Sequence, residues 1–160
     1  MGATGRERVE QARAGKRETS SPPPRVSRLY SLAALLSLAG LADAVYLTVE
    51  HLSGRSVRCT VTSGCSEVLS SPYATIGGYP LALLGALGYF TAFSLATLAA
   101  FGSARAGNLF AALVALMFAT SLWLFYLQAF VLHAFCQYCL LSAAITTLLA
   151  VIVVARRVTT

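Results

Sequence analysis

The chain has 160 residues, of which 57% are hydrophobic and 11% are charged, and its net charge is +6. So high an apolar content at this length excludes an ordinary soluble domain and leaves no room for a soluble catalytic domain. The apolar residues fall into four blocks, each about as long as the ~20 residues that a helix needs to cross a ~30 Å hydrocarbon layer. The sequence therefore predicts an all-α integral membrane protein, built as a four-transmembrane-helix bundle.

Basic residues gather near the two ends of the chain. Residues 1–27 form a basic tail with a Ser-Ser-Pro-Pro-Pro run, a composition that cannot build a core and predicts disorder. Arg105 lies between the second and third apolar blocks, and Arg156 and Arg157 begin a short end at 156–160. Because arginine and lysine concentrate on the cytoplasmic side, both termini and the Arg105 turn are expected in the cytoplasm. Nucleic-acid binding by the tail is the less favoured interpretation.

The membrane bundle is predicted to cover residues 28–155, and its first span runs from about 29 to 50. Asp43 lies inside this span. An acidic side chain is costly in lipid, so Asp43 is expected to face the interior of the bundle. There it could make an interhelical hydrogen bond or handle protons.

An outer loop, residues 51–78, follows the first span. A Ser-Gly turn precedes Cys65, and Glu67 falls in the first turn of the helix that would start there. The apolar face of this helix would consist of Val68, Leu69 and Tyr73. The segment is too short to cross a membrane, so we expect a half-helix that caps the outer mouth of the bundle.

The remaining spans are predicted at about 79–101, 108–132 and 135–155. A C-x-x-C motif, Cys136-x-x-Cys139, heads the last of them. Thiols three residues apart lie on one helical face, and the positive end of the helix dipole favours a thiolate at Cys136. Cys139 is expected one turn deeper, at lipid depth. A dithiol in this position suits electron transfer between a soluble thiol and a lipid-soluble acceptor.

All four cysteines are expected on the outer side, Cys59 and Cys65 in the loop and Cys136 and Cys139 at the mouth of the last span. The outer compartment is the oxidising one, where disulfides form. Three interpretations stay open: static disulfides, a four-cysteine zinc site, and a relay in which a loop disulfide exchanges with one at the membrane edge. The C-x5-C spacing does not match the usual zinc-ligand pairs, and the C-x-x-C motif favours the relay.

The order of these motifs resembles the bacterial branch of the vitamin K epoxide reductase family. The resemblance rests on C-x5-C-S-E-V-L-x-S-P-Y in the loop, then G-x-P, then a late C-x-x-C, and it covers roughly residues 28–155. It implies a four-helix bundle around a quinone. By position, Cys59 resembles the shuttle cysteine that meets a soluble partner, and Cys65 resembles the one that passes the exchange to Cys136. Cys139 resembles the thiol that contacts the quinone.

The resemblance also implies a quinone pocket, whose ligand would be menaquinone or ubiquinone. Ser71 and Tyr73 match family positions at the edge of that pocket. Asp43 is a further candidate beside it, as a source of protons. Vertebrate members have a tyrosine four residues after the last cysteine, where this sequence has Ala143, and an asparagine near the start of the second span, which we do not find. Quinone reduction is therefore a better expectation than epoxide reduction.

The implied activity is that of a quinone-dependent thiol oxidoreductase in the bacterial cytoplasmic membrane. It would reoxidise an exported thioredoxin-like protein and so support disulfide bond formation. Some bacterial members carry a fused thioredoxin-like domain. This sequence ends at Thr160 without one, so the partner is expected to be a separate protein.

Other classes of protein make different predictions. A second bacterial family of quinone-linked disulfide oxidases has its C-x-x-C in the first outer loop, the reverse of the order here. A non-catalytic membrane subunit with structural disulfides would keep its cysteines permanently paired. A four-cysteine metal-binding membrane protein would hold metal and keep free thiols under oxidising conditions.

Overall fold

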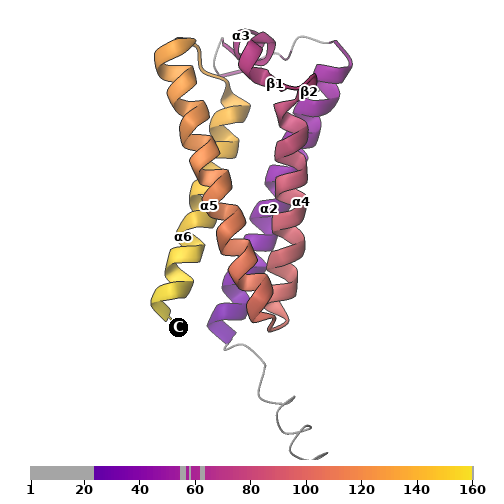
Figure 1. Ribbon diagram of the computed structural model, residues 1–160. Helices are drawn as coiled ribbons and strands as arrows, with labels where there is room; N and C mark the ends of the chain where they lie inside the picture. Colours follow the sequence, from indigo (N-terminus) through magenta and orange to yellow (C-terminus); the bar gives the residue numbers. More distant parts are fainter. Residues whose placement is uncertain (1–23, 55–56, 58, 62–63, 160) are drawn as a thin grey trace, which may run out of the picture.

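The structure is a computed structural model that describes residues 24–54, 57, 59–61 and 64–159. Most of the basic tail, for which disorder is predicted, lies outside the described residues. The described chain is organised around four long helices that lie side by side (Figure 1).

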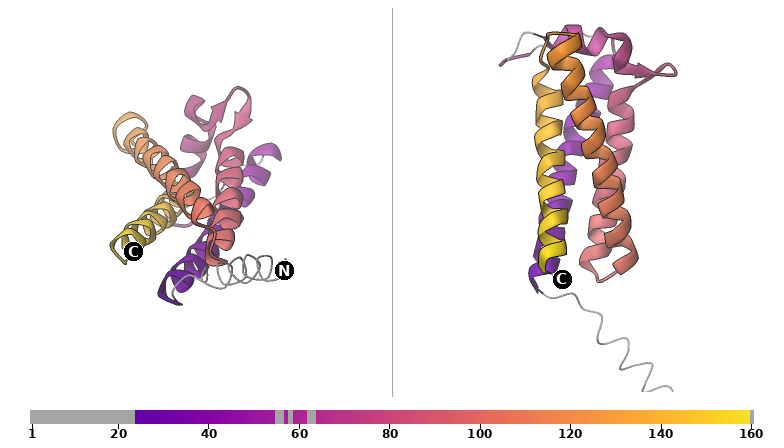
Figure 2. Two further views of the ribbon diagram at one scale, coloured as in Figure 1. Left: turned by 60° about the horizontal axis from the view of Figure 1, so that its bottom comes forward. Right: turned by 60° about the vertical axis from the view of Figure 1, so that its left-hand side comes forward.

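The four long helices are α2 (Pro24–Leu52), α4 (Leu81–Ala100), α5 (Ala104–Tyr126) and α6 (Gln137–Thr159), and a π-helical turn, η2 (Leu127–Val131), extends α5. Each span is long and apolar enough to cross a membrane. The views in Figure 2 show the four helices running together from one end of the bundle to the other. This arrangement confirms the predicted fold class.

Several helix starts differ from the expected ones. Helix α2 begins at Pro24 and not near residue 29, so residues 24–27, which were predicted to belong to the disordered tail, are helical. Helix α5 begins at Ala104, because the Ser103 side chain caps it by accepting a hydrogen bond from the Ala106 N–H at 3.3 Å. Arg105 therefore lies in the first turn of α5 and not in a connecting turn. Helix α6 begins at Gln137, so Cys136 is the residue just before the helix.

The segment between α2 and α4 covers one end of the bundle. Helix α3 (Cys65–Ser70) lies across this end, as expected for the capping half-helix, and a single 3-10 turn, η1 (Pro72–Ala74), follows it (Figure 1). We call this end of the bundle the α3 end. The C-terminal end of α6 lies at the opposite end, where Arg156 donates hydrogen bonds to the Tyr30 hydroxyl and to the Gly107 carbonyl and so joins three helices.

A small hairpin that was not predicted follows η1. Strand β1 (Thr75–Ile76) pairs with strand β2 (Tyr79–Pro80) in an antiparallel register that places Ile76 opposite Tyr79. Gly77 and Gly78 form the turn, with φ of 60° and 87°. Two consecutive positive φ values are characteristic of the tight turns that join two strands, and glycine adopts them without steric cost.

Small residues let α2 and α4 approach closely, and these two helices make the most extensive helix contact. Gly40 of α2 faces the ring of Tyr89 on α4, and a Cβ atom at Gly40 would lie 2.5 Å from Tyr89 Cζ. Tyr89 is only 1% exposed, and its hydroxyl donates to the Ser142 carbonyl at 3.0 Å on α6. Burial of the ring and the hydrogen bond of its hydroxyl group therefore both oppose a displacement of Tyr89.

We expect Gly40→Ala to lower the free energy of unfolding by about 1–3 kcal/mol, because the added methyl group overpacks this contact. Thermal unfolding in detergent measures the effect as a lower melting temperature. Gly85→Ala is the matched control on α4, since among the described residues its Cβ would meet only the Ala44 Cβ, at 3.8 Å. Equal melting temperatures for the two variants would show that a methyl group at position 40 is accommodated beside Tyr89 without loss of stability.

Candidate redox site

The two loop cysteines form a disulfide at the α3 end. Cys59 and Cys65 are bonded, with their Cα atoms 5.6 Å apart. Cys65 is the first residue of α3 and is 1% exposed, and Cys59 is half-buried in the segment before it. The helix start at Cys65 thus fixes one half of the disulfide, while the other half lies in irregular chain.

The C-x-x-C motif stands where the connection after η2 enters α6. Cys136 is fully buried, and its carbonyl accepts the first hydrogen bond of α6 from the Leu140 N–H at 3.0 Å. The Cys136 N–H donates to Gln128 Oε1 at 2.9 Å, which ties the motif to η2. Cys139 lies in the first turn of α6 and is half-buried. Both cysteines are free thiols in this structure.

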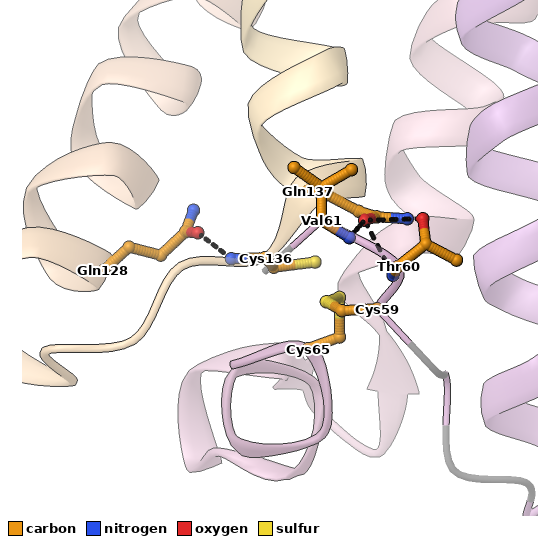
Figure 3. The surroundings of a disulfide bond; sticks show 7 residues. All are labelled: Cys59, Thr60, Val61, Cys65, Gln128, Cys136 and Gln137. Carbon is orange, nitrogen blue, oxygen red and sulfur yellow. Dashed lines mark hydrogen bonds between the residues drawn. A yellow bond between two sulfur atoms is a disulfide. The ribbon is translucent and has the colours of Figure 1, made fainter. Parts of the chain in front are cut away.

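The fold brings all four cysteines into one apolar cluster. Its buried members are Leu47, Val57, Cys65, Val68, Ala134 and Cys136, and Cys59 and Cys139 pack against them. Figure 3 shows the Cys136 sulfur pointing toward the Cys59–Cys65 disulfide. A thiol that faces a disulfide inside a dry cluster can exchange with it, because exchange is the attack of a thiolate on a disulfide sulfur.

The surroundings of Cys136 favour its thiolate. A hydrogen bond from the Cys139 thiol has the largest effect, and with backbone hydrogen bonds from Cys139 and Tyr138 it lowers the pKa of Cys136 from 9.0 to about 7, although burial acts in the opposite direction. The thiolate fraction of Cys136 therefore rises with pH through about 7, two pH units below an ordinary thiol.

We expect the ultraviolet absorbance of thiolate to show one transition near pH 7 when only the loop pair is oxidised. Cys136→Ala should remove this transition. Cys139→Ala should move it toward pH 9, because the thiol that donates to Cys136 is lost. A transition that stays near pH 7 in Cys139→Ala would contradict the assigned cause.

A cavity of about 460 Å³ opens beside the cysteine cluster. All four long helices and α3 contribute to its walls, which are mainly apolar. Every residue predicted for the pocket lines this cavity: Asp43, Ser71, Tyr73 and Cys139. The cavity thus lies against one member of the C-x-x-C pair, while Cys136 faces the loop disulfide.

The cavity residues fit a quinone ring. The volume lies within the range of about 300–1,000 Å³ that small-molecule sites occupy, and apolar walls with few polar groups suit an aromatic ring with two oxygens. The Oδ2 atom of Asp43 is buried and has no hydrogen-bond partner among the described residues, so it is left to meet a polar group of a ligand. The Ser71 hydroxyl, by contrast, already donates to the Val68 carbonyl at 2.7 Å.

Sequence reasoning missed several residues that shape this site. Gln128 accepts a hydrogen bond from the Cys136 N–H, and Gln137, inside the motif, accepts one from the Val61 N–H of the loop. Tyr89 donates a hydrogen bond to Ser142 and so joins two walls of the cavity. The only available signal was a polar side chain inside an apolar block, which Gln128 and Gln137 share. In the part of the chain that the structure describes, no group of three or more His, Cys, Asp or Glu is arranged to hold a metal ion.

Comparison with known protein families places the chain in a family whose model covers most of its length. The model described as "Vitamin K epoxide reductase family" matches residues 31–154. The match includes α4 and α5, most of α2 and α6, the loop disulfide and the C-x-x-C motif.

Proposed function

Because this chain belongs to the vitamin K epoxide reductase family, we propose that it is a membrane oxidoreductase that carries electrons from a soluble dithiol to a quinone through its four cysteines. One observation carries the proposal. Cys136 faces the Cys59–Cys65 disulfide on one side, and its neighbour Cys139 lines the apolar cavity on the other. The C-x-x-C pair thus links the loop disulfide to the cavity.

The first half of the cycle reduces the loop pair. A thiolate of the reduced partner attacks Cys59, forms a mixed disulfide and releases Cys65 as a thiolate. The second thiol of the partner then breaks the mixed disulfide. The partner leaves oxidised, and Cys59 and Cys65 together hold the two electrons and two protons that it gave up.

The second half passes these electrons inward. The Cys65 thiolate attacks Cys136 of an oxidised Cys136–Cys139 pair and releases Cys139. Cys59 then attacks Cys65, which restores the loop disulfide and frees Cys136. The result is an oxidised loop with two free thiols at Cys136 and Cys139, which is the redox state of this structure.

Within the cavity, a bound quinone supplies the oxidant, since it accepts two electrons and two protons to become a quinol. Menaquinone or ubiquinone is the proposed ligand. Cys139 lines the cavity, and Cys136 would close the disulfide with it when the pair is oxidised. Asp43 would hold a proton at its unpaired Oδ2, and Ser71 and Tyr73 would border the ring. The apolar walls exclude water from the reacting thiol.

Reduction of a quinone is proposed, and not reduction of an epoxide. Vertebrate members have a tyrosine at the position of Ala143, and Ala143 lines the cavity here. An alanine offers no hydroxyl group to an epoxide oxygen.

The proposed setting is the bacterial cytoplasmic membrane, with the α3 end facing outward. Arg156, Arg157 and Arg105 all lie toward the opposite end of the bundle, which supports a cytoplasmic location for that end. The proposed partner is a separate, exported thioredoxin-like protein. The α3 end would then meet it in the compartment where disulfides form.

An anaerobic assay tests the proposed function. Purified protein in detergent receives a quinone and a chemically reduced thioredoxin-like donor, and quinol and donor disulfide are measured together. Equal amounts of both products are expected, because each transfer moves two electrons. If no quinol forms with several donors and quinones while the protein thiols stay unchanged, the disulfides only brace the loop.

A further inference from the structure

The middle of the C-x-x-C motif holds the loop that carries the disulfide. Gln137 lies between the two motif cysteines, and its Oε1 atom accepts hydrogen bonds from the backbone N–H of Thr60 at 3.0 Å and of Val61 at 2.8 Å. The Thr60 hydroxyl lies 3.3 Å from the same oxygen. Figure 3 shows these bonds directly beside the disulfide.

The position of this contact in both segments matters for exchange. Gln137 is bonded to Cys136, and Thr60 is bonded to Cys59, so the contact lies one residue away from a cysteine on each side. An amide oxygen has two lone pairs and can accept both N–H groups at once. These two hydrogen bonds involve only backbone groups of the loop, so they do not depend on the identity of the loop side chains.

A second close approach lies on the other flank of the disulfide. Gly64 precedes Cys65, and a Cβ atom at Gly64 would lie 2.8 Å from the Phe135 backbone nitrogen and 2.9 Å from the Ala134 Cβ. The loop is thus seated against the C-x-x-C segment both after Cys59 and before Cys65. Gln128 holds the other side of the same segment through the Cys136 N–H.

We propose that Gln137 is a positioning residue for the internal exchange, which docks the loop so that Cys65 stays within reach of Cys136. The inference rests on the proposed function for its role in turnover. A docked loop raises the effective concentration of one thiol beside the other, as linkage does in any intramolecular reaction. Loss of two backbone hydrogen bonds should lower that concentration by about 10-fold.

The test measures the effective concentration itself. In a Cys59→Ala/Cys139→Ala background the described cysteines that remain are Cys65 and Cys136, and equilibration with glutathione gives the effective concentration from the fraction of disulfide formed between them. Gln137→Leu, which has no acceptor, should lower it by about 10-fold. Gln137→Glu keeps an oxygen acceptor at the start of α6 and should stay within about threefold of Gln137.

A matched control separates the backbone bonds from the side-chain contact. Thr60→Ala removes only the hydroxyl at 3.3 Å and keeps both N–H donors, so the effective concentration should fall by no more than about twofold. An unchanged value in Gln137→Leu, or an equal fall in Gln137→Glu and Gln137→Leu, would overturn the proposal. Thermal unfolding of each variant is measured in parallel. If the effective concentration falls only in variants whose melting temperature also falls, the effect comes from a damaged fold and the proposal is overturned.

Turnover gives a second readout. Gln137→Leu should lower the rate of quinol formation by a larger factor with the thioredoxin-like donor than with a small dithiol, since only the first route requires the loop. The glutathione measurement needs neither quinone nor partner. A wild type that makes no quinol would therefore disprove the proposed function, while the docking role of Gln137 would still be decided by the glutathione measurement.

Discussion

Cys139→Ala should abolish quinol formation with every electron donor, lowering the rate by at least about 1,000-fold. Cys139 is the motif cysteine that lines the cavity, and no other cysteine does so among the described residues. Without it, Cys136 has no partner at the cavity with which to form a disulfide when the quinone takes up electrons. Cys136→Ala should be equally inactive for the reciprocal reason.

The anaerobic quinol assay with both a protein donor and a small dithiol measures this loss. Thr147→Ala is a suitable control on the same helix, because Thr147 is exposed, is not among the residues that line the cavity, and donates its hydroxyl to the Ala143 carbonyl at 2.7 Å. Retention of a tenth or more of the wild-type rate in Cys139→Ala, with either donor, would mean that electrons reach the quinone by another route.

Cys65→Ala should separate the two cysteine pairs. The rate with the thioredoxin-like donor should fall by at least about 100-fold, because exchange through the loop loses its intramolecular advantage. The rate with a small dithiol should remain within a few-fold of wild type, since such a reagent can reduce the Cys136–Cys139 disulfide directly. The loop pair would then lie upstream of the C-x-x-C pair.

Parallel assays of Cys59→Ala and Cys65→Ala with both donors complete this test. The two variants should behave alike, because Cys59 and Cys65 form one disulfide. Equal losses with the protein donor and with the small dithiol would contradict an upstream role, and would indicate that the loop disulfide instead supports the fold around Cys136.

The fold class was predictable because membrane insertion leaves a strong signal in sequence. Apolar blocks of sufficient length can satisfy their backbone groups in lipid only as helices. The capping half-helix was also predictable, since the glycine before Cys65 and the acidic Glu67 mark a helix start. The hairpin at Gly77 and Gly78 escaped prediction, although two consecutive glycines are a turn signal, because strands of two residues have no detectable alternation.

The π-helical turn η2 and the late start of α6 could not be inferred from periodicity. The block from Leu109 to Leu132 is apolar on all sides, so its pattern does not reveal where the backbone leaves the regular helix. The break places Gln128 where its Oε1 can accept the Cys136 N–H. A local change of helix type therefore positions the motif, and only the three-dimensional structure shows it.

The candidate site was predictable at the level of residue types. The cysteines stood out by spacing, and the structure places all four in one cluster and Asp43, Ser71 and Tyr73 around one cavity. Their roles in catalysis and quinone binding stay predictions. The contact between Gln137 and the loop was not foreseeable, because it joins residues 76 and 77 positions apart and depends on how the loop docks.

The most direct measurement of the relay is to identify the disulfide that forms in the Cys59→Ala/Cys139→Ala variant inside native membranes. After mild oxidation, proteolysis and mass spectrometry report which cysteines are joined. The account predicts a disulfide between Cys65 and Cys136 in most of the molecules. If both thiols remain free, or if each is found only in disulfides with other proteins, the loop pair does not pass electrons directly to the C-x-x-C pair.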